Sequence, residues 1–144
     1  MRRFAAGLIG VLLQACTQEP AGEALVHKEV SQKNPGGKDL EMVFREVQRD
    51  DRPSLAKVTY RSGASVPSSV FIMCGFLDTA KARRAQYFIN LKEWDGPDGD
   101  RMYLIGFSND RTISIQQYFQ FDERPSAPDR HELLSVDQFS RICR

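Results

Sequence analysis

The stretch YFINLKEWDGPDGDRMYLIGF, residues 87–107, determines how this chain of 144 residues folds. Apolar and polar residues alternate in 87–94, which is typical of a strand with one buried face, and the apolar segment 102–107 follows a few residues later. Residues 95–100 between them are all Asp, Gly or Pro, the residue types that favour tight turns. The pattern predicts a β-hairpin formed by Tyr87–Trp94 and Met102–Phe107.

A second hairpin is predicted upstream, where Leu40–Val47 fits two patterns. Its apolar residues recur at helical spacing and also at every second position. Only about eight residues precede the break at Arg49–Pro53, which is short for a helix, and the following Ala56–Tyr60 alternates and is rich in β-forming residues. We therefore expect two strands here, although periodicity also permits a helix over Leu40–Val47.

A helix is predicted for Pro67–Arg84. Ser65 is a suitable N-terminal cap, and the fixed φ of Pro67 suits a first helical turn. The first half contains Val70–Leu77, which is apolar on every side, whereas the second half alternates Ala with charged residues. Such a helix is buried at one end and solvated at the other. The run Val70–Leu77 alone would also fit a buried strand.

The C-terminal third predicts one more strand and a short helix. Apolar residues alternate through Thr112–Phe121, and Ser135 and Gln138 have the spacing of a capping box before Phe139–Cys143. Taken together, residues 39–144 predict a single α+β domain. It has a mostly antiparallel sheet of four or five strands, one packed helix and a short C-terminal helix.

The N-terminus has the pattern of an export signal. Two arginines precede the apolar run Phe4–Leu13, which is shorter than the roughly 20 residues of a membrane span. Leu13, the last residue of this run, begins the segment Leu13-Gln14-Ala15-Cys16. This segment resembles the lipobox of bacterial lipoproteins. The resemblance implies that residues 1–15 are a signal peptide and that the thiol of Cys16 is acylated after cleavage. It covers sixteen residues and says nothing about the rest of the chain.

This resemblance also implies a location. Two or more acyl chains hold a protein stably on a membrane, so we expect a lipid-anchored protein of the cell envelope. Thr17, in place of Asp after the cysteine, resembles the sorting signal for the periplasmic leaflet of the outer membrane. Residues 16–38 are polar and contain Pro and Gly, which predicts a lipidated flexible tether spanning roughly 25 Å on average.

Charge and cysteine usage narrow the class further. The chain has 20 Lys and Arg against 19 Asp and Glu, and losing residues 1–15 removes two of the arginines, which leaves 18 against 19. A near-neutral balance argues against nucleic acid as a partner. With Cys16 acylated, Cys74 and Cys143 remain as an even pair in an oxidising compartment, which predicts a disulfide between them.

Residues that could support catalysis or metal binding are few. The spacing of Asp95, Asp98 and Asp100 does not match a calcium loop of the EF-hand type, so a solvated turn is the favoured interpretation. A small hydrolase would need His131 near a nucleophile, since the other histidine, His27, lies in the predicted tether. We therefore predict that the protein is not an enzyme and has no catalytic residues, metal or cofactor.

Aromatic residues of the predicted sheet are the remaining signal. Those that fall on the face away from the helix would form a binding surface, and the candidates are Tyr87, Trp94, Tyr103 and Tyr118. The sequence thus favours a lipid-anchored interaction module that binds another envelope protein, as an assembly accessory, inhibitor or immunity protein. The alternatives are the small envelope hydrolase that uses His131 and a carrier of a small ligand or calcium.

Overall fold

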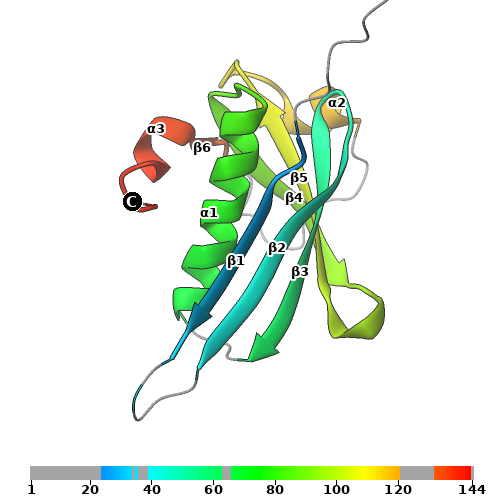
Figure 1. The fold of residues 1–144 in the computed structure, drawn as a ribbon. Coiled ribbons are helices and arrows are strands. Elements are labelled where there is room, and N and C mark those ends of the chain that lie inside the picture. The colour runs from blue at the N-terminus through cyan, green and yellow to red at the C-terminus, as the bar shows by residue number, and fades with distance from the viewer. Residues whose placement is uncertain (1–23, 34, 36–38, 63–65, 121–131, 144) are drawn as a thin grey trace, which may run out of the picture.

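The computed structural model describes residues 24–33, 35, 39–62, 66–120 and 132–143. A curled antiparallel sheet wraps around one long helix, with strand order β1-β2-β3-β5-β4-β6 (Figure 1). The α+β prediction is confirmed, with six strands where four or five were expected. The strands are β1 His27–Gln32, β2 Leu40–Arg49, β3 Pro53–Ser62, β4 Tyr87–Asp95, β5 Arg101–Ser108 and β6 Leu134–Ser135. The helices are α1 Val66–Ala82, the 3-10 turn η1 Pro97–Gly99, α2 Ile115–Phe119 and α3 Val136–Phe139.

Both predicted hairpins are present. Strands β4 and β5 pair from Tyr87 with Ser108 to Asp95 with Arg101, around the turn at 96–100. Two turn residues have positive φ, Asp98 at 64° and Gly99 at 75°, as the Asp and Gly composition favours. Strands β2 and β3 form the other hairpin, so Leu40–Val47 is a strand and not a helix.

The main core lies between α1 and the concave face of the sheet. Its fully buried side chains include Phe44, Val58, Phe76, Leu77 and Ile105. Helix α1 approaches the sheet closely at Gly75, where a Cβ atom would come within 2.5 Å of the Phe44 ring. Glycine at this position therefore permits the contact between helix and sheet.

A second apolar cluster covers part of the opposite face of β4. Ile89, Leu91 and Leu133 are buried there, and Ile115 and Phe119 of α2 pack against them. Because successive strand residues point to opposite faces, Phe88 faces α1 while its neighbour Ile89 faces this cluster.

Two secondary-structure predictions are wrong, one near each end of the described chain. His27–Gln32 was assigned to the tether but forms β1, because Val26 and Val30 pack against the core and Lys28 pairs with Asp78 of α1 at 2.7 Å. Six backbone pairs join β1 to β2. The polar composition of this segment is that of an edge strand with one exposed face.

Where a strand was predicted over Thr112–Phe121, the structure has the short helix α2 at Ile115–Phe119. Ile115 and Phe119 are four residues apart, a spacing that also places them on one face of a helix, and Gln120 ends the helix with a φ of 51°. Residue 121 lies outside the described residues. The edge position beside β4 is occupied by β6 at Tyr87 and Phe88.

The C-terminal helix is present and is linked to α1. The Ser135 hydroxyl accepts a hydrogen bond from the backbone N–H of Gln138, as the capping-box spacing predicted. The Sγ atoms of Cys74 and Cys143 lie 2.05 Å apart, so the structure pairs the two cysteines as expected. In the described part of the chain, no helix is long and apolar enough to cross a membrane.

Candidate functional site

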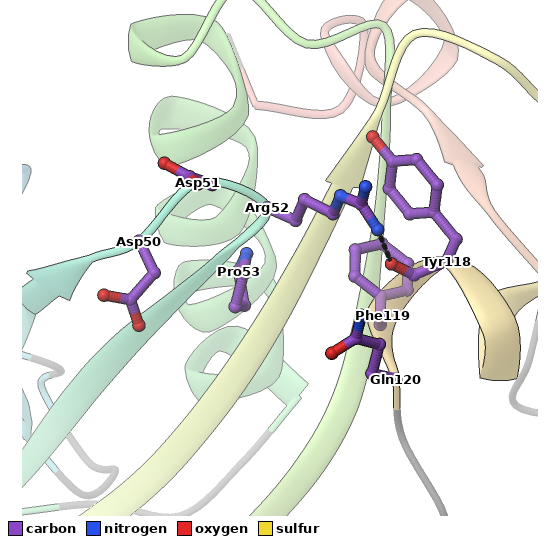
Figure 2. A pocket seen from close by; sticks show the side chains of 7 residues that line it. All are labelled: Asp50, Asp51, Arg52, Pro53, Tyr118, Phe119 and Gln120. Carbon is purple, nitrogen blue, oxygen red and sulfur yellow. Dashed lines mark hydrogen bonds between the residues drawn. The ribbon is translucent and has the colours of Figure 1, made fainter.

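One end of the domain combines elements that are distant in the sequence. The β2–β3 turn, the last turn of α1, α2 and the start of β1 all lie there (Figure 1). We call this the turn end. A cavity of about 370 Å³ opens between the turn and α2. We call it the turn groove; it is lined by Asp50, Asp51, Arg52, Pro53, Tyr118, Phe119 and Gln120 (Figure 2).

A smaller cavity of about 120 Å³ adjoins the turn groove. Asp51 and Tyr118 line both cavities, and Arg83 and Phe107 line only the smaller one. The two hollows therefore form one indented surface, with Asp51 and Tyr118 where they meet.

Arg52 connects the two sides of the groove. Its side chain extends from the turn toward α2, as Figure 2 shows, and it donates a hydrogen bond to the carbonyl oxygen of Tyr118. The guanidinium carbon also lies 4.4 Å from the centre of the Tyr118 ring, a cation–π contact. Phe119 meets the same ring edge-on, with 4.9 Å between ring centres. Tyr118 is therefore held in place while remaining half-exposed.

Arg83 fixes the turn from the side of α1. Its Nη2 donates to the carbonyl oxygens of Asp50 and Asp51, at 2.7 and 2.8 Å, and its Nη1 donates to Ser54 Oγ at 3.1 Å. The guanidinium carbon lies 4.8 Å from the centre of the Phe107 ring. Burial is the main cause that lowers the pKa of Arg83, and the charge of Arg49 lowers it further.

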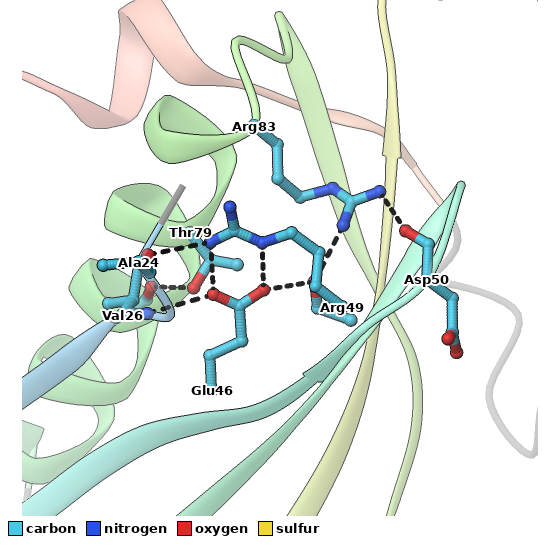
Figure 3. A network of polar contacts seen from close by, with 9 residues as sticks. Ala24, Val26, Glu46, Arg49, Asp50, Thr79 and Arg83 are labelled. Carbon is cyan, nitrogen blue, oxygen red and sulfur yellow. Dashed lines mark hydrogen bonds and ion pairs between the residues drawn. The ribbon is translucent and has the colours of Figure 1, made fainter. Parts of the chain in front are cut away.

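Behind the turn, Glu46 is the centre of a buried polar network (Figure 3). Its side chain is fully buried and accepts four hydrogen bonds. Two come from Arg49, at 2.9 and 2.6 Å, one from Ser54 Oγ at 2.7 Å and one from the backbone N–H of Val26 at 3.0 Å. Burial alone would raise the pKa of Glu46, but these donors outweigh it and lower the pKa. The network joins β1, β2 and β3 beneath the groove.

The exposed chemistry of the groove is polar and aromatic. Asp50, Asp51 and Arg52 are exposed, and no ion pair joins either aspartate to another described residue. The lining residues include neither His nor Cys, so this groove offers no cysteine nucleophile and no imidazole base. Aromatic and arginine side chains are enriched at protein-binding surfaces.

The four predicted surface aromatics are in different places. Tyr118 lines the turn groove, whereas Tyr87 is half-buried at a separate cavity of about 400 Å³ beside α3. Trp94 is half-buried on β4, opposite Met102 of β5. Tyr103 is only 6% exposed and packs on Phe76 with 5.3 Å between ring centres, so its assignment to a binding surface is wrong. It faces α1, and burial is the main cause that raises its pKa.

The other candidate residues do not form a site. Asp95 pairs with Arg101 at 2.5 Å and Asp100 with Lys57 at 3.1 Å. Among the described residues, no three side chains of the metal-binding types converge. His27 lies on β1 beside Glu29. Cys16 and His131 lie outside the described residues.

Of the residues that build the groove, only Tyr118 was a candidate from the sequence. Glu46 had a signal, because it continues the buried series 40, 42 and 44 along β2, where a charged residue requires partners. Arg83, in the charged second half of the predicted helix, and Arg52, in the predicted break, were not candidates. No protein-family model, curated protein or solved structure matches this chain, so the site is defined by its own geometry.

Proposed function

We propose that this protein is a lipid-anchored interaction module of the cell envelope, and that the turn groove binds a neighbouring envelope protein. The observation that carries the proposal is Tyr118, a half-exposed aromatic held by Arg52 and Phe119 beside the free carboxylate of Asp51. When interface residues are truncated to alanine, a few residues of this kind account for most of the binding energy that is lost. The role is that of an assembly accessory, inhibitor or immunity protein.

The rigidity of the groove supports this proposal. Three elements are connected beneath it by Glu46, and Arg83 holds the carbonyl groups of the turn. A surface that is already ordered loses little conformational entropy when a partner binds. The groove therefore has the preorganisation that a docking site needs.

The anchor is the second part of the proposal. It is supported by the basic and apolar N-terminal pattern and by the resemblance of residues 13–16 to a lipobox. Cys16 carries the acyl chains, and the domain stands on the periplasmic leaflet of the outer membrane. We expect labelled fatty acid to enter the wild-type chain but not the Cys16→Ser variant; equal labelling of both would refute the anchor.

The binding role is tested by comparing two tyrosine variants. Acylated full-length protein is incubated with detergent-solubilised envelope, and the proteins that it captures are quantified by mass spectrometry. We expect Tyr118→Ala to reduce specific capture about tenfold, because truncating an interface hot spot costs about 1.4 kcal/mol or more. Tyr60→Ala is the matched control, since Tyr60 is 38% exposed on β3 away from the groove. Equal capture by both variants would contradict the proposal.

A further inference from the structure

The chain enters the domain at the turn end. The carbonyl oxygen of Ala24, the first described residue, accepts a hydrogen bond from Arg49 Nη2 at 3.4 Å. The backbone of Val26 then bonds twice to Glu46: its N–H donates to the carboxylate at 3.0 Å, and its carbonyl accepts from the backbone N–H at 2.8 Å. These are the residues that support the turn groove, so the entry point and the groove share one network (Figure 3).

The distance from this entry point to the proposed anchor is short. Seven residues separate Cys16 from Ala24. The chain takes eight residue steps from Cys16 to Ala24. Fully extended, eight steps reach at most about 28 Å, and a flexible segment of this length has an average end-to-end distance of roughly 15 Å. Strand β3 runs from the turn end to the opposite end of the domain, and its ten residues extend over about 30 Å. An anchor at Cys16 therefore holds the turn end much closer to the lipid than the start of α1.

We infer that the turn end faces the membrane and that the turn groove receives a protein segment lying at the membrane surface, from a partner that is itself membrane-embedded or lipid-anchored. This inference rests on the proposed function, because it takes Cys16 as the anchor. Asp50 and Asp51 against Arg52 give the lining of the groove a net negative charge, which repels the phosphate groups of anionic lipids and favours a protein occupant over the lipid itself.

Energy transfer to labelled lipid tests the orientation. The acylated full-length protein, purified without reductant, is placed on phosphatidylcholine vesicles that carry an acceptor dye on the headgroups. A donor dye is attached at Gln117→Cys on α2, or at Val66→Cys at the start of α1; residue 66 is 79% exposed. We expect stronger transfer from position 117 than from position 66.

The outcomes of this experiment are distinct. Equal transfer from both positions, or stronger transfer from position 66, on vesicles that retain the protein would overturn the orientation and leave the anchor intact. Failure of the wild-type protein to bind vesicles would refute the anchor, and the inference with it. Inserting 20 Gly and Ser residues after Glu19 lengthens the average span about 1.9-fold, which should weaken transfer from position 117.

The occupant is tested with the same insertion. A photoreactive phenylalanine analogue at position 118 is crosslinked in the intact envelope, and the products are identified. For a membrane-bound partner, 20 added residues lower the effective concentration at the groove about sixfold, so the crosslinked fraction should fall. A crosslink of unchanged yield to a soluble protein, or a crosslink to phospholipid, would overturn the proposed occupant.

Discussion

Replacing Glu46 by alanine tests the idea that one buried carboxylate holds the turn end together. The Glu46 side chain has no solvent exposure and receives two hydrogen bonds from Arg49, one from Ser54 and one from the Val26 backbone. Its removal takes the Glu46 carboxylate away from the guanidinium of Arg49, whose side chain is 18% exposed. It also removes the acceptor that holds the start of β1 against β2.

The expected loss is large. Breaking a buried ion pair by removing one partner costs about 3–5 kcal/mol, because the remaining charge and donors lose their compensation. For a domain of this size, such a loss lowers the melting temperature by roughly 10–20 °C. We expect this fall in urea or thermal unfolding followed by circular dichroism. The control is Glu29→Ala, whose side chain is 57% exposed and whose loss should leave the unfolding free energy unchanged.

The pH dependence provides an independent test of the same residue. The pKa of Glu46 in the folded protein is lowered below its ordinary value of about 4.5, since its hydrogen bonds and Arg49 outweigh the effect of burial. Its stabilising contribution is therefore complete above the unfolded pKa and is lost as the pH falls through the folded pKa. Wild-type stability should fall in acid below about pH 4.5, and the Glu46→Gln variant should lose less stability over that range.

The double variant Glu46→Met/Arg49→Met decides between ion pairing and general damage to packing. If the loss in Glu46→Ala comes from breaking its ion pair with Arg49, replacing both partners by apolar side chains should recover part of it. A melting temperature for Glu46→Ala within 3 °C of wild type would refute the reasoning. A double variant less stable than both single variants would show that packing, not charge, dominates.

Three other perturbations follow from close contacts and from chain connectivity. Gly75→Ala places a methyl group 2.5 Å from the Phe44 ring and should destabilise by about 1–3 kcal/mol in denaturant unfolding; an unchanged midpoint would show that helix and sheet separate easily. Cys143→Ser removes a disulfide between residues 69 apart and should lower the free energy of unfolding by up to about 4 kcal/mol; reduced wild type as stable as oxidised wild type would contradict this. Gly106→Ala should displace Phe119, whose ring lies 2.6 Å from the new methyl group, and so weaken partner capture through α2; capture at the wild-type level would contradict this.

Much of the fold could be predicted because local chemistry and burial agree. The hairpin at 87–107 combines alternation with a turn made of Asp, Gly and Pro, and α1 contains the apolar run Val70–Leu77. Strand β1 was missed because its polar residues also suit a tether; only its pairing with β2 and the contacts of Val30 identify it. Helix α2 was missed because Ile115 and Phe119 fit both periods, and packing on β4 decides between them.

The candidate site was less predictable, for a reason that the residues make plain. Tyr118 was a candidate for the binding surface, but its position depends on Arg52, which is 66 residues away in sequence and bonds to its carbonyl. The groove is an arrangement of the β2–β3 turn, α1 and α2, and its members contact one another only after the sheet has curled around α1. Residue types suggest such a surface, but long-range contacts create it.

Strand β1 changes how the protein can act, because it converts part of a predicted tether into structure. A tether of residues 16–38 would let the domain turn freely, and any of its faces could meet the membrane. With β1 paired to β2 and Val26 bonded to Glu46, the chain leaves the domain at one fixed point. Glu46 then has two consequences: it stabilises the turn groove, and it places that groove beside the anchor. Glu46→Ala should therefore weaken partner capture as well as folding, whereas Gly75→Ala, at the contact with Phe44, should lower stability without changing capture by the folded protein. Capture that fell equally in both variants, after correction for the folded fraction, would show that the groove depends on global stability and not on this network.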